Sequence, residues 1–205
     1  MDVRNTLIQH LIVSAFTITL VFIFKYLLAT PLSTSFGRVS FILLFLILII
    51  GPLMKLIKTV SVSSPLAIPW SWRGELGIWF TLTALTHFIL VLSGRPFSDL
   101  IKIGGGGFGL ANSIGLVALF LAILLAATSF GRIIIFLGFE SWRWLHSLTY
   151  VVFYLVSAHF IYFQFFSTYG EVGPDWFGYI ALFAAMIIII LQLTAFVVVT
   201  LKRRS

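Results

Sequence analysis

The stretch WFGYIALFAAMIIIILQLTAFVVVTL, residues 176–201, contains no charged side chain and is apolar along nearly its whole length. A helix that crosses the hydrocarbon core of a bilayer needs about 20 mainly apolar residues, because its backbone polar groups must be satisfied within the segment. This stretch is long enough to cross. Five similar runs precede it, and the full set is Leu7–Ala29, Val39–Leu56, Gly74–Leu92, Asn112–Phe130, Trp142–Phe166 and Trp176–Leu201.

The composition of the whole chain agrees with this pattern. Hydrophobic residues make up 60% of the 205 residues and charged residues 9%, and the mean hydropathy is +1.14. A water-soluble core does not require so much apolar surface. The sequence therefore predicts an all-α integral membrane protein, a six-transmembrane-helix bundle formed by a single domain over residues 1–205. The first run lacks the short apolar core and cleavage site of a signal peptide, so we expect it to be retained as a helix.

Turn-forming stretches are expected to connect the spans. They are Thr30–Arg38, a link with Pro65 and Pro69, the glycine run Gly104–Gly109, and Gly170–Pro174. The glycine run lacks the preceding strand and the following Lys and Ser or Thr of a phosphate-binding loop. It is interpreted as an outer loop. No connection is long enough for a dinucleotide-binding fold, and the positive charge lies at helix ends rather than in a nucleic-acid-binding patch.

Positive charges set the predicted orientation, because Lys and Arg concentrate on the cytoplasmic side of membrane proteins. With six spans, one side carries nine of them: Arg4, Lys55, Lys58, Arg73, Arg132, Arg143, Lys202, Arg203 and Arg204. The other side carries four: Lys25, Arg38, Arg95 and Lys102. Both termini are therefore expected in the cytoplasm, in a multi-pass protein of the cell inner (plasma) membrane. The tryptophans mostly fall near predicted span ends, as in an interfacial aromatic belt: Trp70, Trp72, Trp79, Trp142, Trp144 and Trp176.

Histidines are the main ionisable groups predicted to lie inside the spans, and such groups usually face a cavity, a partner or a cofactor. His87 lies 13 residues after Gly74, and His159 lies 13 residues after His146, so each is about 20 Å further outward. His87 and His159 are thus expected at one depth on two parallel helices. No cysteine is present, which excludes thiolate ligands and cysteine nucleophiles.

Two imidazoles at one depth are a reasonable pair of axial ligands for a b-type haem. A single histidine in a membrane helix more often makes an interhelical hydrogen bond. On one ideal helix His146 and His159 lie about 140° apart, so a tilt, a kink or haems on different sides would be needed to use both. No carboxylate is expected inside the membrane, where it would be the usual group of a proton relay.

The run containing Trp142, Leu145, His146, Tyr150 and His159 resembles the fifth helix of ferric reductase-like transmembrane domains. Within that family, the sequence is most similar to the MsrQ (YedZ) haem subunits of the bacterial methionine sulfoxide reductase system. Further stretches of the same pattern are Phe36-Gly37-Arg38, Arg73 with Leu76-Gly77 before His87, and Leu125–Ser129. The resemblance extends from about Phe36 to Tyr162.

This resemblance implies a b-type cytochrome that carries electrons from cytoplasmic flavin or quinol to an outer acceptor, acting as an oxidoreductase subunit with partner proteins. It implies His87, His146 and His159 as haem iron ligands, with one or two haems b. Related NADPH oxidases and metalloreductases place a second histidine on the third helix, where this chain has Arg73. An inner haem at His146 would therefore need another ligand, bind with five coordination, or be absent. FMN or quinone would be held loosely or through a partner.

Other residues were considered for the inner side. His10 is a candidate second ligand, although a histidine near the interface needs no special role. Arg73, Arg132 and Arg143 are candidates to bind haem propionates, since guanidinium binds carboxylate in a forked geometry, or else they anchor the cytoplasmic side. The similarity to MsrQ points to an outer molybdenum-dependent reductase as acceptor. Alternative functions are a histidine-dependent proton or metal transporter and a non-catalytic anchor subunit.

Overall fold

The computed structural model describes residues 3–59, 72–102, 108–166 and 174–202. Within these ranges the regular elements are all helical, and no strand occurs. The α-helices are α1 (Val3–Phe22), α2 (Leu32–Thr59), α3 (Trp72–Gly94), α4 (Phe97–Ile101), α5 (Phe108–Ala127), α6 (Gly131–Leu137), α7 (Phe139–His146), α8 (Thr149–Ile161) and α9 (Trp176–Lys202). Two π-helical segments, η1 (Ile23–Leu27) and η2 (Tyr162–Phe166), extend α1 and α8.

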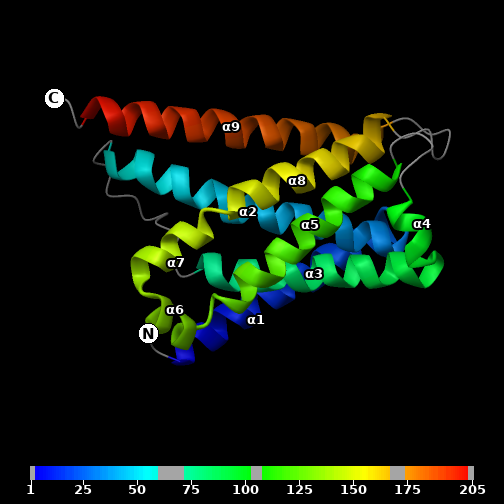
Figure 1. The fold of residues 1–205 in the computed structure, drawn as a ribbon, viewed down its shortest axis with the longest axis horizontal. Coiled ribbons are helices and arrows are strands. Elements are labelled where there is room, and N and C mark those ends of the chain that lie inside the picture. Colours follow the sequence, from blue (N-terminus) through cyan, green and yellow to red (C-terminus); the bar gives the residue numbers. More distant parts are fainter. Residues whose placement is uncertain (1–2, 60–71, 103–107, 167–173, 203–205) are drawn as a thin grey trace.

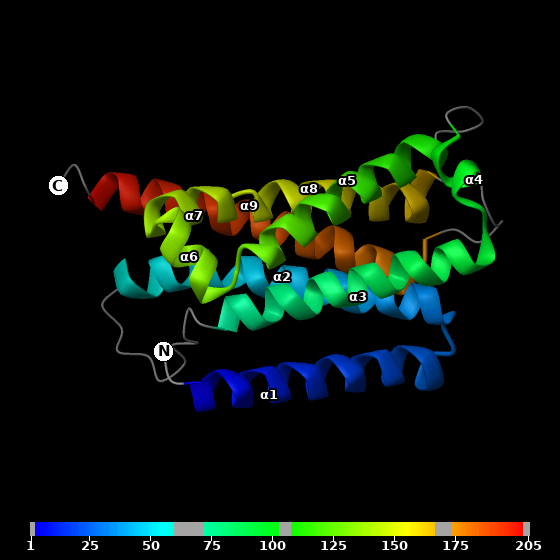
Figure 2. The ribbon, with the colours of Figure 1, turned by 60° about the horizontal axis from the view of Figure 1, so that its bottom comes forward.

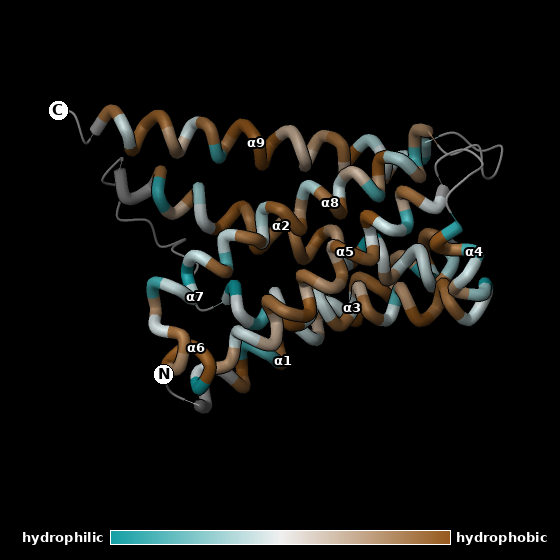
Figure 3. The backbone as a smooth tube through the Cα atoms, in the orientation of Figure 1, coloured by the Kyte–Doolittle hydropathy of each residue, from teal (hydrophilic) through white to brown (hydrophobic). Residues whose placement is uncertain are grey.

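Six helical segments of the described residues are long and apolar enough to cross a membrane, which confirms the predicted number of spans. They are Leu7–Leu27, Leu32–Leu56, Trp72–Gly94, Gly109–Ala127, Phe139–Phe166 and Trp176–Leu201. Figure 3 shows that hydrophobic residues run along most of the length of these helices. Many large apolar side chains on their outer faces are exposed, as expected of surfaces that face lipid rather than water.

Helix α2 lies at the centre of the bundle. It packs against α3 along much of its length and also against α9 (Figures 1 and 2). Its apolar side chains Val39, Leu43, Leu44 and Leu48 are completely buried. They belong to a core that includes Val152 and Phe153 of α8 and Ile188 of α9. This core holds together the helices that carry the candidate ligands.

The bundle has two distinct ends. Val3 and Lys202, the first and last described residues, lie at the same end, which we call the termini end (Figure 1). The short helix α4 lies at the opposite end, which we call the far end. The shared end for both termini agrees with an even number of spans. Which end faces the cytoplasm stays a prediction.

The second span begins earlier than the sequence predicted. Thr30–Arg38 was expected to be a connection, but α2 already begins at Leu32, directly after Pro31. Proline is compatible with the start of a helix, because its missing N–H would have no intrahelical partner there and its fixed φ suits helical backbone. Gly37 and Arg38 are consequently helical residues rather than loop residues.

The fifth span is not the single helix expected from Trp142 to Phe166. A helical segment ends at Leu137, Gly138 adopts a φ of +76°, and α7 then begins at Phe139. A second break at Ser147 and Leu148 separates α7 from α8. The calculated 140° between His146 and His159 assumed one continuous helix and therefore does not apply.

Several features named from the sequence lie outside the described residues. They are Pro65 and Pro69 with Trp70, Gly104–Gly107 of the glycine run, residues 170–173 of the fifth connection, and the basic residues Arg203 and Arg204.

Candidate functional site

His87 lies on α3 and reaches across to the first turns of α2. Its Nδ1 atom is 2.7 Å from the main-chain carbonyl oxygen of Ser33. The ring passes directly over Gly37, where a Cβ atom would lie 3.2 Å from Nδ1. Because Gly37 has no side chain, the imidazole can approach the α2 backbone closely enough to make this hydrogen bond.

His159 on α8 makes the same arrangement with α5. Its Nδ1 atom is 2.8 Å from the carbonyl oxygen of Ala111. Its ring lies over Gly115, where a Cβ atom would be 2.7 Å from Nδ1. In each case the glycine follows the accepting residue by four positions, one helical turn later. The ring of Phe163 packs edge-on against His159, with the ring centroids 5.0 Å apart.

These hydrogen bonds fix the form of both imidazoles. A carbonyl oxygen only accepts, so Nδ1 carries the proton and donates in both histidines. In the neutral ring, the lone pair available for a metal is then on Nε2. Histidines that bind metals usually donate their other ring N–H to a carbonyl or carboxylate, which orients the ring. His87 and His159 both meet this condition.

The two histidines are brought together by the fold. His87 and His159 lie within range of electrostatic interaction with each other. His87 lies in the last third of α3 and His159 near the end of α8. Both helices run towards the far end of the bundle (Figure 1). That the two histidines lie at one level of a membrane stays a prediction.

The pair suits a haem better than a bare metal ion. Among the described residues, no group of three or more His, Asp, Glu or Cys side chains converges as metal ligands. A haem iron needs only axial ligands from the protein, because the porphyrin supplies the remaining ones. Two buried polar atoms beside these ligands have no hydrogen-bond partner among the described residues: Asn112 Nδ2, next to Ala111, and Ser157 Oγ, two residues before His159. Each such atom costs about 1–3 kcal/mol unless a bound group satisfies it.

His146, the third histidine singled out from the sequence, is held differently. Its Nε2 atom is 3.2 Å from the hydroxyl oxygen of Thr128, which itself donates to the carbonyl of Leu124 or Leu125. The hydroxyl has only one proton, so Nε2 of His146 is the donor in their contact. The Trp142 ring packs on the imidazole at 4.4 Å and its indole N–H donates to the Thr128 carbonyl. The Nε2 atom, which no recorded hydrogen bond engages in His87 and His159, thus makes a hydrogen bond in His146.

Arg73 lies close to His146, which is the position expected of a residue that binds the propionate of a haem at His146. Its guanidinium interacts electrostatically with both His146 and Tyr150. Its Nη1 atom and the Tyr150 hydroxyl both lie within 4 Å of the position that a Cβ atom on Gly51 would occupy. Arg73, Tyr150 and His146 therefore form one cluster near the termini end, which we call the inner cluster.

No contact of Arg143, Arg132 or His10 with the inner cluster is seen among the described residues. Arg143 is exposed, with its guanidinium 5.9 Å from the Phe139 ring centre, and Arg132 is also exposed. His10 lies on α1, where it is partly exposed. Their roles at a cofactor stay predictions.

Arg38 differs most from its expected position. It was counted as an outer positive charge of a loop, but it is buried on α2 and forms an ion pair with Asp175. Phe24, Trp176 and Phe177 surround the guanidinium at 5.1–5.9 Å from their ring centres. Asp175 also accepts from the Gly178 N–H at 3.0 Å and so caps the start of α9. This ion pair connects the start of α9 to α2. On α2 it is made by the residue directly after Gly37, over which the His87 ring lies.

The expectation that no carboxylate lies within the spans was wrong. Glu75 belongs to the first turn of α3 and is only 3% exposed. Its Oε2 atom has no hydrogen-bond partner among the described residues. In the sequence Glu75 stands at the start of the third run, where a charge usually reaches the interface.

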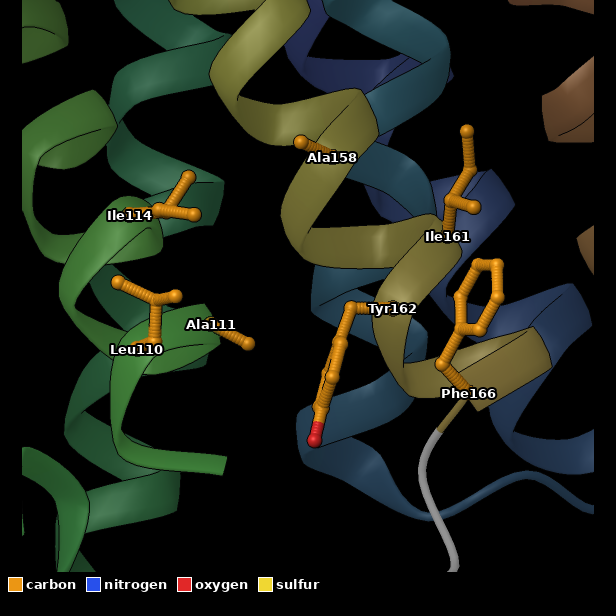
Figure 4. Close-up of a pocket in the computed structure, with 7 residues that line it drawn as sticks. All are labelled: Leu110, Ala111, Ile114, Ala158, Ile161, Tyr162 and Phe166. Carbon is orange, nitrogen blue, oxygen red and sulfur yellow. The ribbon is translucent and has the colours of Figure 1, made fainter. Parts of the chain in front are cut away.

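An apolar cavity of about 340 Å³ lies between α5 and the end of α8. Figure 4 shows Leu110, Ala111 and Ile114 on one wall and Ala158, Ile161, Tyr162 and Phe166 on the other. None of its lining residues comes from α2 or α3. It is therefore a groove between α5 and α8, and it borders the His159 site at Ala111, whose carbonyl accepts from His159.

Sequence reasoning identified the histidines but missed what holds them. Gly37 belongs to the family pattern without a role of its own there, and Gly115 is not part of that pattern. Glycine inside a helix costs about 1 kcal/mol relative to alanine, so its presence there indicates a close approach by another group. That signal was available at Gly115, which stands in the middle of an apolar run. The sequence gives no indication that the main-chain carbonyls of Ser33 and Ala111 accept these hydrogen bonds.

Comparison with known proteins agrees with this geometry. Residues 36–157 match the family described as ferric reductase like transmembrane component. No curated protein matches the chain significantly. The matched segment contains both glycines beneath the imidazoles together with His87 and His146, and it ends two residues before His159.

Proposed function

We propose that this chain, which belongs to the ferric reductase-like transmembrane family, carries electrons across a membrane through a b-type haem held by His87 and His159. Membership in the family indicates transmembrane electron transfer. The observation that carries the proposal is the duplicated anchoring of the two imidazoles, each with Nδ1 donating to a neighbouring helix and Nε2 left for iron.

The protein's own contribution is to place and tune the redox group. The haem, when bound, supplies the one-electron chemistry of its iron. His87 and His159 hold it, and their hydrogen bonds to the carbonyls of Ser33 and Ala111 set the orientation and basicity of the ligands. The surrounding apolar helices exclude water, which together with axial ligation tunes a haem's reduction potential.

A second haem at His146 is the finer part of the proposal. The inner cluster offers Arg73 as a partner for a propionate, while Arg143 and Arg132 would contribute only if their side chains moved inward. His146 would have to exchange its contact with Thr128 for iron, or bind through Nδ1. We therefore propose one haem with two histidine ligands, and a second with His146 as its single histidine ligand if it is present.

The direction of transfer follows from the predicted orientation. With the termini end in the cytoplasm of a cell inner membrane, electrons would enter from quinol or a flavin reductase near the inner cluster. They would leave near His87 and His159 to an outer acceptor. By similarity to MsrQ, that acceptor would be a molybdenum-dependent methionine sulfoxide reductase. FMN would be bound loosely or through a partner protein.

The decisive experiment is to purify the full chain and measure haem content and spectra. We expect a b-type spectrum with low-spin bands, because two histidine ligands give a strong axial field. The variants H87A, H146A and H159A then assign the ligands. A protein without haem, or a spectrum that is unchanged in both H87A and H159A, would refute the proposal.

Buried Glu75 keeps a second function open, since a carboxylate inside a span is a common proton-transfer group. A histidine-dependent proton or metal transporter would move ions in liposomes without haem. Flux that disappears in E75Q but persists in haem-free protein would favour that alternative over electron transfer.

A further inference from the structure

We infer that a second cavity, between α2, α8 and α9, binds one anionic phospholipid of the surrounding membrane. Its volume is about 320 Å³, which is within the range of small-molecule sites. The cavity would hold the phosphate and the glycerol ester groups, while the acyl chains stay outside. It shares no lining residue with the groove between α5 and α8. This lipid site does not depend on the proposed haem.

The cavity lies beside a surface that faces the hydrocarbon of the membrane. Ala195, Phe196 and Val199 line it from α9. Phe196 is 69% exposed, and Leu193 and Val197 nearby on α9 are exposed as well. A lipid can therefore reach the cavity from the bilayer while its acyl chains remain in contact with this outer face of α9.

The polar side chains that line the cavity are arranged by depth. Lys55 lies four residues before the end of α2 and Thr200 two residues before the end of α9, both at the termini end (Figure 1). Gln192 precedes Thr200 by eight residues, which is about 12 Å along the helix. A phospholipid has its phosphate at the membrane surface and its ester carbonyls deeper, where the hydrocarbon begins. Lys55 and Gln192 follow the same order.

Gln192 supplies the most specific feature of the site. Its Oε1 atom accepts a hydrogen bond from the Tyr154 hydroxyl at 3.1 Å, which leaves the NH₂ group as the other polar end of the amide. That Nε2 atom is buried and has no hydrogen-bond partner among the described residues. Buried donors are nearly always satisfied, so a bound group with an acceptor atom is indicated. An ester carbonyl oxygen of a phospholipid is such an acceptor.

The charge of the cavity favours an anionic headgroup. Lys55 is the one charged residue among those that line it in the described structure. Its ammonium group attracts a lipid phosphate, and the hydroxyls of Thr200 and Tyr150, which also line the cavity, can donate to phosphate oxygens. A zwitterionic headgroup would bring a second ammonium group close to Lys55, whereas phosphatidylglycerol would not.

Inorganic phosphate is the competing occupant, because it would suit Lys55 equally well. It has no ester carbonyl for Gln192, however, and it would lose hydration against the apolar wall of Ala195 and Phe196. A phospholipid suits both ends of the cavity at once. Because the bound lipid would contact α2, α8 and α9 together, its binding would stabilise the packing of these three helices.

The test measures lipid binding to the full-length protein, purified in detergent and freed of native lipid. Native mass spectrometry would count adducts of dioleoyl phosphatidylglycerol, and the thermal midpoint would be recorded over the same titration. We expect one saturable adduct per chain and a midpoint that rises with it. Dioleoyl phosphatidylcholine should bind more weakly. Dioleoylglycerol, which lacks the phosphate, and inorganic phosphate should each leave the midpoint unchanged.

Variants assign the two contacts. Q192L should weaken phosphatidylglycerol binding about tenfold, which corresponds to the loss of one hydrogen bond, and K55Q should weaken it at least as much. The matched controls are T194V, at an exposed residue of α9 that does not line the cavity, and K102Q, at an exposed lysine of the far end. Both should bind like the wild type. V199F, which fills the cavity, should abolish binding and provides a further test if Q192L or K55Q fails to fold.

Equal binding by the wild type and the three cavity variants would overturn the site. Equal binding of phosphatidylcholine, or an equal midpoint shift from dioleoylglycerol, would overturn recognition of an anionic phosphate. A midpoint shift from inorganic phosphate alone would assign the cavity to a free anion instead of a lipid. Binding that is lost in the cavity variants and kept in T194V and K102Q would support the proposal. The haem spectrum of the same samples tests the electron-transfer proposal separately.

Discussion

Gly115 stands where a Cβ atom would lie only 2.7 Å from Nδ1 of His159. Real Cβ atoms essentially never approach another heavy atom so closely. The ring is held there because Nδ1 donates to the carbonyl of Ala111, one turn earlier on the same helix. The helix itself would be more stable with alanine at position 115. Glycine is needed there because the His159 ring occupies the space of a side chain.

The first prediction follows from this contact. G115A should displace the His159 imidazole, weaken or abolish low-spin haem binding, and lower the stability of the bundle by about 1–3 kcal/mol through overpacking. G37A should have a smaller effect of the same kind, because the corresponding distance to His87 is 3.2 Å. Haem absorbance per protein and the thermal midpoint in detergent would measure both effects.

The matched control for these variants is G77A. Nothing lies within 4 Å of a Cβ atom at Gly77, which is on the same helix as His87. It should retain the haem and gain up to about 1 kcal/mol from helix propensity. Equal haem loss in G115A and G77A would show that the glycine contact does not position the ligand.

The second prediction separates the three histidines. H87A and H159A should each lose the low-spin spectrum of the proposed pair, whereas H146A should keep it, because His146 is held by Thr128 and Trp142 away from the pair. Absorption and electron paramagnetic resonance spectra would distinguish these cases. H10A serves as the control. Retention of the low-spin signal in H159A would contradict the assignment.

The membrane fold could be predicted from the sequence because it depends on long apolar runs, and each of the six runs overlaps one of the six spans found. The residues at which helices start or are interrupted could not be predicted from the sequence. Thr30–Arg38 suggested a connection, but α2 begins within it at Leu32, and the break at Ser147 and Leu148 lies in a run whose hydropathy suggests one span. These features depend on tertiary packing and on backbone conformation rather than on average hydropathy.

The candidate site was partly predictable for the same reason. Helical rise placed His87 level with His159, since depth depends only on counting along each helix. The ion pair of Arg38 with Asp175 was not predictable, because it joins residues 137 positions apart. The carbonyls that fix each imidazole are also invisible in the sequence, since every residue has one.

The third prediction concerns this ion pair. Arg38 is 4% exposed, so D175N would leave a buried charge without its partner and should destabilise the bundle by about 3 kcal/mol. The double variant R38M/D175N should recover part of this loss, because the charge itself is then removed. Thermal unfolding of the four forms gives the coupling energy. D99N, at an exposed carboxylate near the far end, is the control. Strict additivity of the two substitutions would exclude a coupled pair.

The fourth prediction concerns orientation. The chain contains no cysteine, so a single introduced thiol reports its own side of the membrane. D99C, near the far end, should react in intact cells with a membrane-impermeant maleimide, whereas E140C, near the termini end, should react only after lysis. Both positions are exposed in the described structure. The reverse labelling pattern would place the termini outside and reverse the proposed direction of electron flow.

The matching anchors of His87 and His159 have a consequence for how the protein assembles. Each imidazole is tied to the helix of its own half of the chain: His87 to α2, 54 residues away, and His159 to α5, 48 residues away. Each half therefore contains the carbonyl that orients its own ligand, and neither supplies more than one ligand of the pair. A haem that binds both would act as a bridge between the halves, so its binding energy would favour the assembled bundle over separated hairpins.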